Sequence, residues 1–306
     1  MSLRQRENRN GWLFVAPATV HLLLFAILPI GFTLYLSLFR WKLYEPSKTY
    51  LGLRNYIYSF HDAAFLNALS NSLKYALVAV PSGIVVALAI AIMLNQKIRL
   101  SSFFRTIYYL PAISSGVAIS MIWIYIYLPE TGLINTMMLG LSHFVSRFTG
   151  HEFYGGVDFL GKSETALWAL AFMSIWIGLG PKVVLFMAGL IGVPQTLYEA
   201  AMLDGANGWQ SFWRITLPML VPTSLFVVVT STISAIQVFT PVYMMTKGGP
   251  EDSTDVVGFH IYNEAWTSFN TGLASAKSFI LFVLIALIAV IQFRMTRKQL
   301  EGHSTF

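Results

Sequence analysis

The sequence of 306 residues is 56% hydrophobic and only 11% charged, with a formal net charge of +6 and no cysteine. A soluble domain carries about 25% charged residues, so this composition excludes a soluble globular protein and indicates a membrane protein. The lack of cysteine excludes disulfides and thiolate metal sites, and the lack of a basic stripe interleaved with aromatic residues disfavours a nucleic-acid partner.

Six apolar stretches are long enough to cross a bilayer, which takes about 20 residues. They cover residues 12–39, 73–94, 107–128, 165–192, 218–244 and 276–294. Each is expected to be a helix, because backbone groups in lipid must be hydrogen-bonded within their own segment. The first stretch is too long for a signal peptide and lacks a small-residue cleavage site. The sequence therefore predicts an all-α membrane protein with one transmembrane domain over residues 1–306.

Lysine and arginine residues indicate how the helices are oriented. With the N-terminus inside, basic residues are concentrated in short inner segments and sparse in the longer outer ones, as cytoplasmic segments require. The inner basic residues are Arg4, Arg6, Arg9, Lys97, Arg99, Arg105, Arg214, Arg294, Arg297 and Lys298. Their density predicts that both termini are cytoplasmic.

The outer segment between the third and fourth stretches contains GVDFLGKS, Gly156–Ser163, which fits the phosphate-binding pattern G-x-x-x-x-G-K-[ST]. Such a loop needs a buried strand before it and a soluble helix after it. Here a polar, turn-rich segment precedes the motif and a membrane helix follows it. The match is therefore expected to be a coincidence, with no nucleotide site on this chain.

The inner loop between the fourth and fifth stretches, Val193–Pro218, is unusually long. Pro194 suits the first turn of a helix, Gln195–Leu203 are good helix formers, and Gly205 is placed to end that helix in a left-handed conformation. A second short helix is expected to carry Trp209, Phe212 and Trp213 on one face. The loop is predicted to form a compact helix–turn–helix.

The residues of the first loop helix suit docking better than catalysis. Ala200 and Ala201 are small enough for another protein to approach closely, and Glu199 and Asp204 could pair with basic residues. No histidine, serine or second carboxylate converges there as catalysis would require. From the chemistry alone, docking to a protein and resting on the membrane surface both remain open.

The spacing of residues in this loop resembles the EAA loop of binding-protein-dependent ABC importers. The pattern is Glu199-Ala200-Ala201, three residues, Gly205, nine residues, then Ile215-x-Leu217-Pro218. Three further segments resemble the carbohydrate-uptake group, which includes maltose and glycerol-3-phosphate permeases: Leu51–Tyr56, Arg105 with Leu110-Pro111, and Gly248–Pro250.

This resemblance implies a permease subunit of the type I ABC importer fold, in a bacterial cytoplasmic membrane. It implies partners: a second, homologous permease chain, two ATP-binding cassette subunits and an extracytoplasmic solute-binding protein. Mg-ATP would be used on the partner subunits, so this chain would be no enzyme and would hold no cofactor or metal. Loop 193–218 would couple to the ATPase through Glu199, Ala200, Ala201, Asp204, Gly205, Ile215, Leu217 and Pro218.

The fifth stretch offers a possible solute path. Thr230, Ser234 and Gln237 are spaced four and three residues apart, which predicts one polar helix face. These groups could bind the hydroxyls of a disaccharide, glycerol-3-phosphate or polyol, or they could bond to neighbouring helices. Since the stretches contain no Asp or Glu, the alternative of a secondary active sugar carrier is disfavoured.

Lys182 is a charged residue deep within the fourth stretch. Because lipid exposure would be costly, it should face a cavity or another helix. It could favour an anionic solute or pair with a carbonyl freed by Pro181, and the structural role is the preferred expectation. The resemblance also implies that the outer loops 128–164 and 245–275 meet the solute-binding protein.

Overall fold

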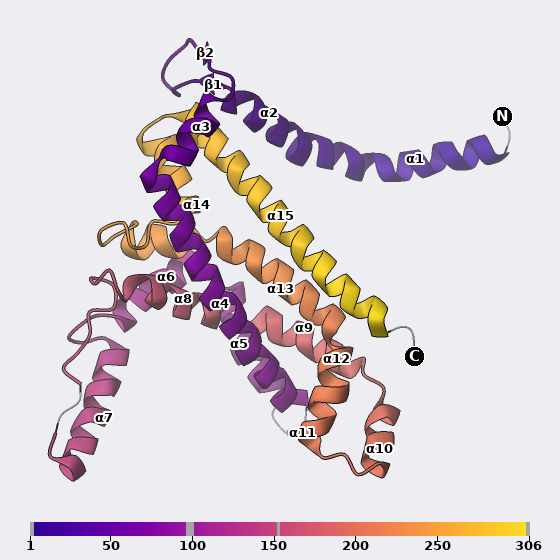
Figure 1. The fold of residues 1–306 in the computed structure, drawn as a ribbon, viewed down its shortest axis with the longest axis vertical. Coiled ribbons are helices and arrows are strands. Elements are labelled where there is room, and N and C mark those ends of the chain that lie inside the picture. Colours follow the sequence, from indigo (N-terminus) through magenta and orange to yellow (C-terminus); the bar gives the residue numbers. More distant parts are fainter. Residues whose placement is uncertain (1–2, 96–100, 152–153, 304–306) are drawn as a thin grey trace. The chain divides into compact units, whose positions relative to one another are not determined.

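A computed structural model describes residues 3–95, 101–151 and 154–303, and within them the side chains of 11–95, 103, 106–151 and 154–295. The chain divides into two compact units, which are described separately. Unit 1 comprises Met1–Leu66 and Ile261–Leu284, and unit 2 comprises Asn67–His260 and Ile285–Phe306. The described residues are helical apart from one two-stranded hairpin and the connecting turns (Figure 1).

Unit 1 begins with a long apolar helix in three parts: α1 (Leu3–Leu22), a π-helical turn η1 (Leu23–Ile27) and α2 (Leu28–Ser37). Pro29 has no N–H to donate to a carbonyl one turn earlier. In the π turn before it, the Leu28 N–H donates to the Leu23 carbonyl, five residues earlier. Between Gly11 and Ser37 this helix is long and apolar enough to cross a membrane.

A hairpin and a short helix close the end of this first span. Strand β1 (Phe39–Arg40) pairs antiparallel with β2 (Thr49–Tyr50), and α3 (Arg54–His61) follows. The buried Asn55 side chain donates to the carbonyls of Ser37, at 2.8 Å, and Phe39, at 2.9 Å. The segment Leu51–Tyr56 thus satisfies carbonyls left free at the end of α2.

The later part of unit 1 contains the π turn η4 (Asn263–Thr267) and the start of α15 (Thr271–His303). A Cβ on Gly272 would overlap the Phe39 carbonyl, so only glycine lets α15 begin against β1.

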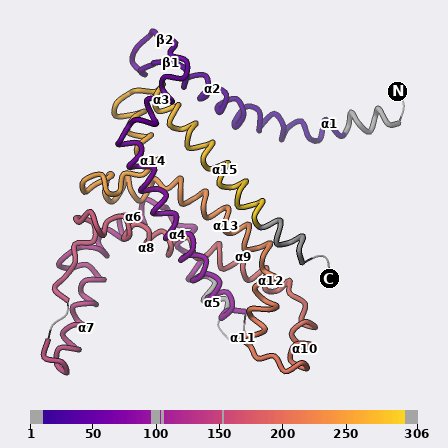
Figure 2. Tube along the Cα trace, in the orientation of Figure 1, coloured from indigo at the N-terminus to yellow at the C-terminus, as the bar shows by residue number. Residues whose placement is uncertain are grey.

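Unit 2 carries most of the helices. They are α4 (Ala63–Asn95), α5 (Ser101–Ile113), α6 (Gly116–Ile126), α7 (Leu133–Thr149), α8 (Ala166–Ile177), α9 (Leu179–Ile191), α10 (Gln195–Leu203), α11 (Gly208–Ser211), the π turn η2 (Phe212–Thr216), α12 (Leu217–Met219), α13 (Val221–Ile236), the π turn η3 (Val242–Thr246) and α14 (Val257–Tyr262). Figure 2 traces the same path along the chain.

Small residues bring the helices of unit 2 close together. Ala87 and Ala91 of α4 are fully buried in a core with Val183 and Phe186 of α9. A Cβ on Gly180 would lie 2.5 Å from the Tyr108 carbonyl oxygen, so the backbones of α5 and α9 meet at this glycine. Small residues at such positions let membrane helices pack by close van der Waals contact. This contact matters because the hydrophobic effect does not drive helices together within lipid.

Gly180→Ala is expected to destabilise the protein, because the added methyl group would push α9 away from α5. Overpacking of this kind costs about 1–3 kcal/mol, which corresponds to a fall in melting temperature of roughly 5 °C. Gly140→Ala is the control: it lies inside α7 with no atom within 4 Å of the new methyl group. Thermal unfolding in detergent checks the pair, and equal melting temperatures would contradict the packing at Gly180.

The predicted spans appear as helices, but half of them are broken. In the described residues three helices are long and apolar enough to span: Gly11–Ser37, Ala63–Asn95 and Thr271–Met295. Three bent pairs bring the number to six if each pair is one span: Thr106–Ile113 with Gly116–Ile126 (109°), Ala166–Ile177 with Leu179–Ile191 (47°), and Gly208–Met219 with Val221–Ile236 (66°).

Two expected boundaries are wrong. A single helix was predicted over 107–128, whereas the structure has a break after Ile113, where Ser115 is extended (ψ 126°). The fifth span was predicted to reach residue 244, but α13 ends at Ile236 and Gln237 is its C-cap. Pro241 cannot donate a backbone hydrogen bond, which is consistent with the helix ending before it.

The outer segment 128–164 was expected to be a turn-rich loop, yet it contains α7. Leu133, Met137, Leu141, Phe144 and Phe148 recur at helical spacing along it and are all exposed. The buried Asn135 fixes the helix to the loop after it, since its side chain donates to the Leu128 and Val157 carbonyls at 2.9 Å each. That spacing was the signal for a helix.

Most of the basic residues behind the predicted orientation lie outside the described side chains. These are Arg4, Arg6, Arg9, Lys97, Arg99, Arg105, Arg297 and Lys298. The cytoplasmic placement of both termini therefore stays a prediction.

Candidate coupling loop and solute cavity

The predicted loop helix is present as α10, and it has no buried residue. Pro194 is extended (ψ 128°) and precedes the helix rather than lying in its first turn. Leu203 is 91% exposed and Met202 72% exposed. A nine-residue helix is too short to be stable alone in water, so its ends must be fixed by the rest of the loop.

The C-terminal end of α10 is fixed at Gly205, as predicted. Gly205 has φ 81°, in the left-handed region, and no atom lies within 4 Å of an added Cβ. The Ala206 N–H donates to the Ala201 carbonyl at 2.9 Å, and the Gly205 N–H donates to the Met202 carbonyl at 3.1 Å. These two bonds form a Schellman motif, which needs a left-handed residue at the position of Gly205.

The next turn is equally well defined. Asn207 caps α11: its side chain accepts from the Gln210 N–H, and the Gln210 side chain accepts from the Asn207 N–H, each at 2.9 Å. The Tyr198 hydroxyl lies 2.8 Å from the Thr216 hydroxyl and links α10 to η2. The loop is therefore one helix–turn–helix held by hydrogen bonds at its turn, in which α10 leads through a sharp turn into α11 (Figure 2).

The residues predicted to couple differ in exposure. Glu199, Ala200, Asp204 and Gly205 are exposed, whereas Ala201, Ile215, Leu217 and Pro218 are half-buried. The aromatic side chains of the second half lie together, with the rings of Trp209 and Trp213 5.6 Å apart and those of Phe212 and Trp213 5.3 Å apart. Trp209 is 70% exposed. Polar and aromatic groups of this loop thus face outward.

The phosphate-loop pattern has the wrong surroundings for a nucleotide. The Gly161 N–H, which would face a phosphate, donates to the carboxylate of Asp158 at 2.8 Å. The Ser163 hydroxyl donates to the carboxylate of Glu251 at 2.9 Å. In the described part of the chain, the element directly before the motif is helix α7 and not a strand. Two carboxylates occupy the donors that an anion would need.

A cavity of about 550 Å³ in unit 2 is lined by residues of α4, α8, α9 and α13. All four residues predicted for a solute path line it: Lys182, Thr230, Ser234 and Gln237. The size is in the range of small-molecule sites, about 300–1,000 Å³. Although Gln237 lies just beyond the end of α13, it still faces the same cavity as the helix residues before it.

The three polar residues of the stripe have different partners. The Thr230 hydroxyl donates to the Phe226 carbonyl of its own helix at 2.7 Å. Ser234 and Gln237 are exposed, and neither side chain has a hydrogen bond among the described residues. Their donors and acceptors are available in the cavity, whereas the Thr230 hydroxyl is already satisfied by its own backbone.

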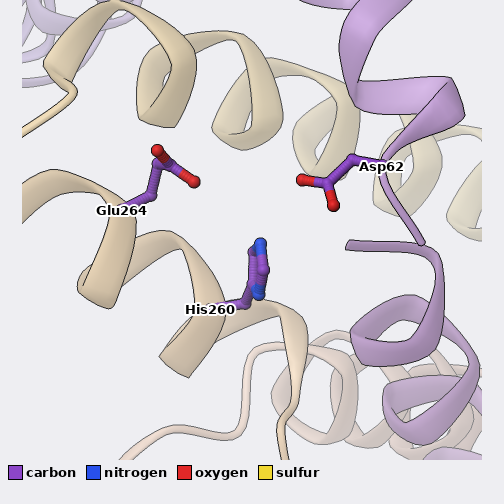
Figure 3. A group of neighbouring side chains, drawn as sticks. All are labelled: Asp62, His260 and Glu264. Carbon is purple, nitrogen blue, oxygen red and sulfur yellow. The ribbon is translucent and has the colours of Figure 1, made fainter. Parts of the chain in front are cut away.

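Sequence reasoning missed a buried ionic cluster in unit 1. The Lys277 ammonium is fully buried and donates to Asp62 at 2.8 Å and to Glu264 at 2.9 Å. Figure 3 shows the Asp62 and Glu264 carboxylates turned toward one another. Burial alone raises the pKa of Asp62, but the hydrogen bond and charge of Lys277, with backbone N–H groups, outweigh it and hold that pKa below its usual value.

Comparisons with known proteins agree with this architecture. Residues 79–300 match the family described as "Binding-protein-dependent transport system inner membrane component". The chain is 34% identical to the "Probable ABC transporter permease protein YurN" of Bacillus subtilis (strain 168), over 95% of this chain and 97% of that protein. It is 30% identical to the sn-glycerol-3-phosphate transport system permease protein UgpA of Salmonella typhimurium, over 98% of this chain and 99% of that protein.

A solved structure shows the same fold. A chain of the bacterial alginate ABC transporter, crystallised in complex with its alginate pentasaccharide-bound periplasmic protein, superposes with a TM-score of 0.79. It is 23% identical, and the match covers 97% of each chain. With a family model matching most of its length, this chain belongs to the inner-membrane components of binding-protein-dependent transport systems, the permease subunits of ABC importers.

Proposed function

We propose that this chain forms half of the translocation path of an ATP-driven importer for a sugar-like solute. In this proposal it crosses the bacterial inner membrane six times, with both termini in the cytoplasm. It works with a second permease chain, two ATP-binding cassette subunits and an extracytoplasmic solute-binding protein. The family membership sets aside the alternative of a secondary carrier.

The observation that carries the proposal is the rigid, unburied α10. A short apolar-ended helix held by a Schellman motif, with exposed Met202 and Leu203, suits insertion into a groove of another protein. Ala200 and Ala201 allow close approach, and Glu199 and Asp204 pair with basic groups. Ile215, Leu217 and Pro218 join the loop to α13 and transmit its movement.

The solute passes the cavity that Ser234 and Gln237 line. Disaccharides, glycerol-3-phosphate and polyols all present hydroxyl groups that these side chains can bind. The similar proteins include permeases of a glycerol-3-phosphate system and of an alginate transporter, which supports a sugar-like solute.

This chain itself binds no cofactor in the proposal, and Mg-ATP is used on the partner subunits. The carboxylate of Asp158 in the GKS-containing segment and that of Glu251, which accepts from Ser163, support this part, because they repel phosphate.

Purification of the tagged chain from its own membrane in mild detergent tests the assembly. The expected product is a complex with a second permease and an ATP-hydrolysing subunit, while the chain stripped of partners hydrolyses no ATP. Solute uptake by proteoliposomes holding the complex should require internal ATP. Uptake driven by an ion gradient without ATP would overturn the proposal.

Gln237→Ala tests the solute path. Losing one hydrogen bond to a neutral group costs about 0.5–1.5 kcal/mol, so the KM of uptake should rise roughly three- to tenfold with little change in maximal rate. Gln292→Ala is the control, because Gln292 bonds to Thr232 and does not line the cavity. An unchanged KM in Gln237→Ala would remove this residue from the path.

A further inference from the structure

Lys182 is the one charged residue among the described residues that line the cavity. It lies in α9, it is half-buried, and its ammonium makes no hydrogen bond or ion pair with any described residue. No carbonyl near Pro181 accepts from it, so the expected pairing with such a carbonyl is not present. An ammonium group has three donors, and here all three are available to the cavity.

Two glycines leave room for this ammonium. A Cβ on Gly178 would lie 2.7 Å from Lys182 Nζ, and a Cβ on Gly83 would lie 3.3 Å from it. Any larger residue at Gly178 would force the ammonium to move. The end of α8 and the facing side of α4 are thus shaped around the charged group.

Lys182 lies in the first turn of α9, and its ammonium lies beside the C-terminal end of α8. The carbonyl end of a helix is favourable for a cation, and the effect is typically 0.3–1 kcal/mol. That stabilisation uses none of the three N–H donors in a hydrogen bond. A purely structural lysine would be expected to bond a carbonyl or a carboxylate, as Lys277 does in unit 1.

A second polar group in the wall has only Ser174 beside it as a partner. The Tyr75 side chain is 1% exposed, and its hydroxyl has no hydrogen bond of good geometry, although Ser174 lies beside it. Both residues line the cavity with Lys182. A buried hydroxyl whose hydrogen bond has poor geometry costs free energy, which a bound polar ligand would recover.

We infer that the cavity receives a solute carrying a carboxylate or phosphate, with Lys182 as its counter-ion. None of the described residues that line the cavity has a carboxylate that could neutralise Lys182. Hydrogen bonds between an ammonium and an oxyanion are about twice as strong as neutral ones. Ser234, Gln237 and Tyr75 bind the hydroxyls of the same solute. This inference rests on the proposed solute path and narrows its solute class.

The absence of cysteine from the chain makes a direct test possible. Ser234→Cys is introduced alone, and the intact importer is treated with a negatively charged and a positively charged methanethiosulfonate reagent. In the parent background the anionic reagent should label faster than the cationic one. The ratio of the anionic to the cationic labelling rate should fall roughly tenfold in Lys182→Met, because the charge of Lys182 sets the electrostatic potential in so small a cavity. Lys162→Met, which removes an exposed lysine outside the cavity, should leave the ratio unchanged.

Pairs of solutes that differ only in an acidic group test which chemical class of solute the cavity binds. Galacturonate should slow the labelling more than galactose, and glycerol-3-phosphate more than glycerol, with the difference lost in Lys182→Met. Equal protection by the neutral members, or a labelling ratio that does not depend on Lys182, would overturn the inference while leaving the solute path intact. If Ser234→Cys is labelled by neither reagent in any nucleotide state, the proposed path itself is wrong.

Discussion

Gly205→Val is expected to abolish transport while the chain still inserts into the membrane. A β-branched residue in the left-handed region costs about 1–3 kcal/mol, and Gly205 has φ 81°. The cost is expected to fall on the loop, since no described atom lies within 4 Å of the added Cβ. Without the left-handed turn the two Schellman bonds are lost, and α10 no longer has a fixed end for docking. Uptake should fall at least tenfold.

Two other variants make this test specific. Gly205→Asn should retain most of the uptake, because asparagine tolerates the left-handed conformation. Gly208→Val applies the same change three residues later, where φ is ordinary and the space is open, and it should transport nearly normally. Uptake and recovery of the ATPase subunit with the tagged chain are measured together. Normal transport by Gly205→Val with its ATPase bound would show that this loop does not couple.

Lys277→Met is expected to lower stability by about 3–5 kcal/mol, because it leaves two buried carboxylates without their cation. Asp62 and Glu264 are each more than four-fifths buried in unit 1 and share the one ammonium. The variant should give little folded protein, or a sharply lower melting temperature in detergent. The triple variant Lys277→Met with Asp62→Asn and Glu264→Gln should recover much of the loss, since it removes the unpaired charges. Equal melting of Lys277→Met and the parent protein would contradict the cluster.

The same cluster predicts a pH dependence. The folded pKa of Asp62 is lowered, so its contribution to stability is complete above the unfolded pKa of about 4 and is lost as pH falls through the folded value. Melting temperature should therefore change little between pH 7 and pH 5 on account of Asp62, and should fall below about pH 4. In the triple variant, the part of the fall in melting temperature below about pH 4 that is due to Asp62 should disappear.

Local patterns predicted the coupling loop well. The helix over Gln195–Leu203 and the left-handed Gly205 both follow from propensity and capping within a few residues of sequence, and both are present. The stripe Thr230, Ser234 and Gln237 was also predicted, since it depends on helical spacing and on the apolar residues between. The end of α13 was missed, because the stretch remains apolar up to residue 244 although the helix stops at Ile236.

Features that depend on distant segments were beyond sequence reasoning. Asp62, Glu264 and Lys277 lie on three separate elements, and nothing in their neighbourhoods signals that they meet. The bend of 109° after Ile113 was likewise not predicted, because two serines and a glycine, Ser114–Gly116, were read as part of an otherwise apolar span. The cavity is lined by several helices that are far apart in the sequence, so the surroundings of Lys182 could be learned only from their packing.

The central claim is that α10 inserts into an ATP-hydrolysing subunit. Leu203→Cys, the sole cysteine of the chain, is labelled with a photoactivatable maleimide in the intact importer, with Gly140→Cys on α7 as the control. Illumination should link Leu203→Cys to the ATPase subunit and Gly140→Cys to no such subunit. Capture of lipid alone at Leu203→Cys, while ATP-driven uptake continues, would contradict the claim.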